Sequence, residues 1–113
     1  MGSVYLVYDK QLDTKVALKT LNVSSGLDIY LFKREFRSLA DLRHVNLVTL
    51  YELVSEGELL FFTMEYVVGV PFDRYLLAQS SSPQSRERTL TAVQQLCAGV
   101  HAMHETGCIH RDL

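Results

Sequence analysis

Cysteine is scarce in this sequence of 113 residues, which contains Cys97 and Cys108 and has no tryptophan. The two cysteines lack the CxxC spacing and the neighbouring ligands that a zinc site needs. A pair of distant thiols also does not make the disulfide framework of a small secreted domain. We therefore interpret both as reduced, small apolar side chains of a cytoplasmic protein.

A large charge of either sign is missing as well. The formal net charge is −2, and no basic run indicates a nucleic acid or a membrane surface as a partner. The longest strongly apolar run, at 59–64, is far shorter than the about 20 residues that cross a bilayer. Hydrophobic residues make up 48% of the chain, which is enough for the core of a globular domain.

The first half of the chain alternates apolar and polar residues with the period of β-strands, and one stretch between the strands has the period of a helix. This order predicts two antiparallel hairpins with a helix between them. The helix begins at Asp28, which we predict as its N-cap. The predicted strands are 3–9, 15–21, 47–54 and 58–66, and the predicted helix is 28–43.

Beyond residue 66 the pattern becomes helical. We predict a connector at 67–71, a short helix at 72–79 and a long helix at 84–106 that Gly107 ends. The serine-rich segment 80–83 links the two helices. The predicted fold class is therefore α+β, with a small sheet-and-helix lobe at 1–66 followed by the first helices of a helical lobe at 72–113.

Two charged residues stand where the pattern favours apolar ones. Lys19 shares a strand face with Ala17 and Leu21, and Glu35 falls within the apolar stripe of the predicted helix. A buried ammonium or carboxylate group needs a partner, so the two side chains can pair with each other. Alternatively, each side chain reaches water from the edge of its apolar surface.

Five short motifs follow one another along the chain, and each is weak by itself. Together, in this order and on these elements, they resemble the protein kinase domain in the style of bacterial serine/threonine kinases. One departure is Val45, where the family usually has proline. The motifs are Gly2-Ser3-Val4-Tyr5, Val16-Ala17-Leu18-Lys19, His44-Val45-Asn46-Leu47-Val48, Phe62-Thr63-Met64-Glu65-Tyr66-Val67 and Ile109-His110-Arg111-Asp112-Leu113.

This resemblance implies a kinase N-lobe, made of an antiparallel sheet without its first strand plus the C-helix. The hinge at 67–71 then leads into an incomplete helical C-lobe that ends at the catalytic loop. The resemblance also implies ATP and Mg²⁺ as cofactors. The implied nucleotide contacts are Gly2 over the phosphates, Val4 and Ala17 on the adenine, Met64 at the back of the pocket, and the backbone of Glu65 and Val67 at the adenine edge.

The resemblance also implies the catalytic roles. Lys19 holds the α- and β-phosphates and is positioned by Glu35. Asp112 orients the hydroxyl of a protein serine or threonine and accepts its proton, while Arg111 meets a phosphate on the activation loop. His110 has a structural role. The magnesium ligands are expected beyond Leu113, so no metal ligand is assigned in this chain.

Several alternatives stay open at this point. Tyrosine or dual specificity is possible, because the residues that usually distinguish it follow HRDL. A pseudokinase or scaffold that holds nucleotide without chemistry is the competing class. We expect both ends of the sequence to be cut, with Met1 internal to a longer protein, although an error in gene calling would give the same ends. By itself the chain is then expected to be inactive and marginally stable.

Overall fold

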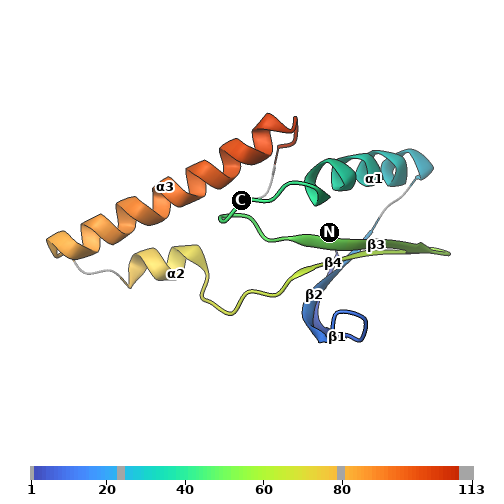
Figure 1. The fold of residues 1–113 in the computed structure, drawn as a ribbon, viewed down its shortest axis with the longest axis horizontal. Helices are drawn as coiled ribbons and strands as arrows, with labels where there is room; N and C mark the ends of the chain where they lie inside the picture. Colours follow the sequence, from blue (N-terminus) through green and yellow to red (C-terminus); the bar gives the residue numbers. More distant parts are fainter. Residues whose placement is uncertain (1, 23–24, 79–80, 110–113) are drawn as a thin grey trace. The chain divides into compact units, whose positions relative to one another are not determined.

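The computed structural model describes residues 2–22, 25–78 and 81–109. The chain divides into two compact units, Met1–Tyr66 and Val67–Leu113. The first unit contains the strands and one helix, and the second unit contains helices (Figure 1), which confirms the predicted α+β class. The elements are β1 (Val4–Asp9), β2 (Thr14–Leu21), α1 (Gly26–Ala40), β3 (Leu50–Glu56), β4 (Leu59–Glu65), α2 (Phe72–Leu77) and α3 (Pro83–Glu105).

The four strands form one antiparallel sheet in the order β1-β2-β4-β3. β2 and β4 lie in the centre and carry its most buried apolar residues, Val16 at 1% exposure and Leu60 at 2%. The hairpin between β1 and β2 turns through Asp9, whose Oδ1 accepts hydrogen bonds from Gln11 N at 2.9 Å and Leu12 N at 3.0 Å. This side chain replaces ladder bonds that the turn residues cannot make.

The predicted start of the third strand at residue 47 is wrong, because β3 begins at Leu50. The preceding segment is a turn in which Leu47 N donates to His44 O at 3.1 Å and Asn46 N donates to His44 Nδ1 at 3.0 Å. These local bonds use backbone and side-chain groups that a strand would have directed to its neighbour.

The helix α1 also begins earlier than predicted. Ser25 is the N-cap, and its hydroxyl accepts a hydrogen bond from Asp28 N at 3.2 Å, so the assignment of Asp28 as N-cap is wrong. Asp28 instead lies in the first turn, where a carboxylate favours the positive end of the helix dipole. At the other end, Arg43 Nη1 donates to Ala40 O at 2.6 Å.

Three phenylalanine rings join α1 to the sheet. The ring of Phe62 on β4 lies 6.0 Å from that of Phe32 and 5.7 Å from that of Phe36, measured between centroids. Both distances fall in the range of favourable tilted aromatic contacts. Phe36 is the buried residue of the helix, at 8% exposure. The sheet therefore has an inner face, which is the one that α1 covers (Figure 1).

The second unit has helices at nearly the predicted positions, α2 and α3. Ser82 caps α3 by accepting a hydrogen bond from Ser85 N at 3.2 Å, and Gly107 follows the helix with a φ of 85°. None of the helices in the described ranges is both long and apolar enough to cross a membrane. Several apolar residues of α3 are exposed, namely Leu90, Val93, Leu96 and Cys97.

We predict that Phe62→Ala lowers the free energy of unfolding by about 3 kcal/mol, because it removes the ring that α1 packs against. Urea unfolding followed by circular dichroism measures the change. Tyr30→Ala is the matched control on α1, since Tyr30 is 60% exposed, and its effect should stay within about 0.5 kcal/mol. Equal losses in the two variants would contradict the role given to Phe62.

Candidate functional site

The register of the sheet brings four of the predicted site residues to one face. Val4 is the cross-strand partner of Lys19, and Met64 is the partner of Ala17. Cross-strand partners point to the same side of a sheet, and residues two apart on a strand do so as well. Lys19 also pairs with Phe62, the ring under α1, so all four side chains are on the inner face.

Gly2 lies where no side chain fits. A Cβ atom added to it would overlap the backbone carbonyl oxygen of Thr20. The backbones are held together there because Ser3 N donates to Thr20 Oγ1 at 3.0 Å and Thr20 N donates to Ser3 O at 2.9 Å. The close approach of two backbones is thus a structural reason for glycine, beside the phosphate contact that the sequence predicts.

Lys19 and Glu35 are each a neighbour of one of the phenylalanines in the aromatic contact. Lys19 is half-buried opposite Phe62, and Glu35 precedes Phe36 on the helix. Glu35 is exposed, and no ion pair joins it to Lys19 in the described part of the chain. The helix turns Phe32 and Phe36 to the sheet, which leaves Glu35 at the edge of the buried stripe. The pairing of the two charges stays a prediction.

Glu65 ends β4, and both its backbone and its side chain are tied to Thr49. Its backbone N–H donates to Thr49 O at 2.8 Å, and its carboxylate oxygen Oε2 accepts a hydrogen bond from Thr49 N at 3.1 Å. The sequence motif assigned only backbone groups of Glu65 and did not predict a role for its side chain. Val67 lies in the second unit and is 60% exposed.

The predicted catalytic residues Arg111 and Asp112, together with His110, lie outside the described residues. Their roles therefore stay predictions. Across 2–22, 25–78 and 81–109 there is no cluster of three or more His, Cys, Asp or Glu side chains that could hold a metal ion.

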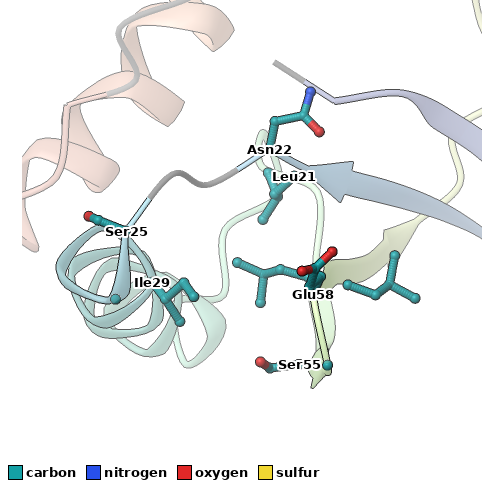
Figure 2. A pocket seen from close by; sticks show the side chains of 10 residues that line it. Leu21, Asn22, Ser25, Ile29, Ser55 and Glu58 are labelled. Carbon is teal, nitrogen blue, oxygen red and sulfur yellow. The ribbon is translucent and has the colours of Figure 1, made fainter.

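A pocket of about 480 Å³ lies at the other end of the sheet, between the start of α1 and the β3–β4 turn (Figure 2). Its apolar residues include Leu21, Ile29 and Leu60, and Glu58 lines it as well. Leu21 and Leu60 are cross-strand partners at one end of the β2–β4 ladder, and Val16 and Glu65 are partners at its other end. The two pairs are five residues apart, which is about 17 Å along a strand. The pocket shares no residue with the predicted nucleotide contacts, and no role is assigned to it.

In protein kinases the lysine that binds the phosphates of ATP lies on a strand of the sheet, as Lys19 lies on β2 here. A profile of the protein kinase domain matches residues 1–113. The chain belongs to the protein kinase domain family, as the resemblance of its motifs predicted. This family uses ATP and Mg²⁺.

Bacterial serine/threonine kinases are among the relatives by sequence. PrkC of Bacillus subtilis is 33% identical over 116 residues, and the match covers 100% of this chain and 18% of PrkC. PknD of Chlamydia trachomatis is 34% identical over 125 residues, which is 100% of this chain and 13% of PknD. The chain thus spans less than a fifth of the length of these two curated relatives.

Solved structures support the fold. A point mutant of the PknI kinase domain from Mycobacterium tuberculosis superposes with a TM-score of 0.80 at 24% identity, over 100% of this chain and 47% of that one. Another crystal structure of the same kinase domain gives a TM-score of 0.78 at 24% identity, with the same coverage of both chains. At this identity the comparison speaks for the fold alone.

We predict that Gly2→Ala destabilises the first unit by about 1–3 kcal/mol, because the new methyl group must push the Thr20 carbonyl aside. Thermal unfolding of the full-length gene product measures it. Gly26→Ala is the matched control, since a Cβ there meets nothing within 4 Å. A Gly2→Ala protein as stable as the control would show that the two backbones are not held this close.

Proposed function

We propose that the protein to which this chain belongs transfers the γ-phosphoryl group of ATP to serine or threonine hydroxyls of other proteins. The observation that carries the proposal is the inner face of the sheet, where the register gathers Val4, Ala17, Lys19 and Met64. These are three apolar side chains and one ammonium group on a single surface. Membership of a family of ATP-dependent kinases supports the same function.

In this proposal the apolar residues receive the adenine ring. Val4 and Ala17 pack against its face, and Met64 limits the depth of the pocket. The backbone carbonyl of Glu65 and the backbone N–H of Val67 bond the adenine edge, while Gly2 lets the backbone approach the phosphates. Each of these contacts orients ATP before the reaction and does not change during it.

Lys19 and Glu35 act on the phosphates. The ammonium group of Lys19 binds the α- and β-phosphate oxygens, which stabilises the charge that builds up as the γ-phosphoryl group leaves. Glu35 holds Lys19 in position when α1 brings the two together. The exposed position of Glu35 is compatible with a helix that moves before the pair forms.

Asp112 supplies the second half of the reaction. Its carboxylate orients the substrate hydroxyl and accepts its proton as the oxygen attacks the γ-phosphorus. Arg111 pairs with a phosphate of the activation segment, and His110 supports the loop that carries both. Bound Mg²⁺ neutralises charge on the phosphates, and its ligands are expected beyond Leu113.

A pseudokinase or scaffold is the second candidate. It would keep the fold and lose one of the groups that act on phosphate. Lys19, Glu35 and Asp112 are all present in the sequence, which favours the enzyme. Tyrosine or dual specificity is the alternative substrate class, and the serine/threonine kinases among the relatives favour the hydroxyls proposed above.

The division of the chain in the proposed enzyme follows its two units. Residues 1–66 belong to the small lobe without its first strand, 67–71 form the hinge, and 72–113 begin the large lobe. Cys97 and Cys108 are not joined in a disulfide, and the proposed enzyme is cytoplasmic, where ATP and protein substrates meet.

We predict that Lys19→Met in the full-length gene product lowers kcat/KM for phosphotransfer at least about 100-fold, because a donor to the phosphates is lost. Radiolabelled transfer from ATP to a serine- and threonine-containing protein measures it. Lys15→Met is the matched control, an exposed lysine on the same strand β2, and should keep normal activity. Full activity in Lys19→Met would remove the role assigned to Lys19.

We predict that Asp112→Asn reduces kcat by about 10²- to 10⁴-fold and leaves ATP affinity unchanged, because the amide cannot accept the proton and does not touch the nucleotide. Single-turnover transfer and calorimetric ATP binding separate the two quantities. Asp73→Asn, an exposed substitution on α2, is the control. Unchanged turnover, or a loss confined to ATP binding, would contradict the role of Asp112 as the base.

A further inference from the structure

We propose that the side chain of Glu65 is a positioning group for the nucleobase: by bonding the backbone of Thr49 it fixes the carbonyl that receives the adenine amino group. The inference rests on the proposed function for the adenine contact. The hydrogen bond itself is a feature of the structure and involves only residues of the first unit.

Glu65 lies where the sheet stops. It is the last residue of β4 and pairs with Val16 on β2, after which the chain leaves the ladder at Tyr66. On its other side, β3 begins only at Leu50 and its register shifts between Leu50 and Glu52. The regular ladder therefore weakens next to the residue whose carbonyl must hold a defined direction.

The carboxylate of Glu65 adds a hydrogen bond where the regular ladder weakens. Thr49 O accepts the backbone N–H of Glu65 at 2.8 Å, and Oε2 of the same residue accepts Thr49 N–H at 3.1 Å. Both backbone groups of Thr49 are thus satisfied by one residue. A hydrogen bond to an ionised carboxylate is stronger than one between neutral groups, so it resists fraying of the strand end.

Thr49 lies in the connection between α1 and β3, and the first part of this connection is hydrogen-bonded. Arg43 donates to the carbonyl of Ala40, the last residue of the helix, and His44 receives hydrogen bonds from Asn46 N and Leu47 N. These bonds order the connection as far as Leu47, and Thr49 itself is bonded to Glu65. Loss of the carboxylate removes one of the two hydrogen bonds between Glu65 and Thr49, and it removes no group that faces the inner side of the sheet.

The consequence is a change in base selectivity. Adenine presents an amino donor at the position where guanine presents a carbonyl acceptor. A fixed backbone carbonyl at residue 65 accepts a hydrogen bond from the amino group of adenine and repels the carbonyl of guanine. A carbonyl that is not fixed can turn away from guanine. Glu65→Ala should therefore raise KM for ATP about fivefold with kcat little changed, and lower the ATP-to-GTP ratio of kcat/KM by about the same factor.

The experiment compares Glu65→Ala, Glu65→Gln and Glu56→Ala in the full-length gene product. Glutamine keeps an oxygen that accepts Thr49 N–H, so the ATP-to-GTP ratio should stay within about twofold of wild type. Glu56→Ala removes the same charge from an exposed position on β3 and should change nothing. Deuterium exchange of a peptide covering 44–50 tests the hydrogen bond from Thr49 N to the Glu65 carboxylate without nucleotide. The exchange of this peptide should rise in Glu65→Ala alone.

Three results would overturn the proposal. One is a normal ATP-to-GTP ratio in Glu65→Ala. Another is an equal fall in the alanine and glutamine variants, because the acceptor oxygen would then be irrelevant. The third is a loss of thermal stability with ATP and GTP affected alike, which indicates a general role in folding. If the wild-type protein transfers no phosphate, the proposed function fails together with its adenine contact. If deuterium exchange of the 44–50 peptide is also unchanged in Glu65→Ala, the hydrogen bond between Glu65 and Thr49 fails as well.

Discussion

The packing of α1 on Phe62 is the contact on which the arrangement of the first unit depends. Phe62 lies in the middle of the sheet, with Lys19 as its partner on β2 and Leu53 on β3. Phe32 and Phe36 close over it from the helix. A four-stranded sheet alone has two equivalent faces, so this contact decides which face is inner. With that choice made, the alternation along each strand places Val4 and the other site residues on the same side.

Strand pairing is the part of the structure that the sequence predicts well. Alternation of apolar and polar residues identifies both hairpins, whereas the pairing of β2 with β4 that joins the hairpins into one sheet comes from the structure. The errors occur where a single local hydrogen bond decides. Ser25 rather than Asp28 caps α1, because the hydroxyl of Ser25 reaches Asp28 N. His44 holds residues 44–47 in a turn, so the strand that periodicity predicts from residue 47 begins only at Leu50. Sequence periodicity carries no information about such side-chain contacts.

The rotation of α1 about its own axis could not be predicted either. The helical pattern groups Leu31, Phe32, Glu35 and Phe36 on one side, but it does not say which of them points at the sheet. The two rings take the centre because they cover the most apolar area, which leaves Leu31 40% exposed. Lys33 is half-buried, and Glu35 is exposed at the edge of the stripe. The placement of a charge at the edge of a stripe therefore depends on its larger neighbours.

Gly2 and Lys19 show how fold and function contribute differently to a motif. The close approach of Thr20 explains glycine at position 2 without any ligand, so this glycine alone says little about phosphate. Lys19 is different. It is half-buried on the inner face between its cross-strand partners Val4 and Phe62, where the neighbouring side chains are apolar. Neither a hydrogen bond nor an ion pair in the described ranges explains a charge there. The proposed function supplies a reason for the charge, because the phosphates of ATP would bring negative charge to that face.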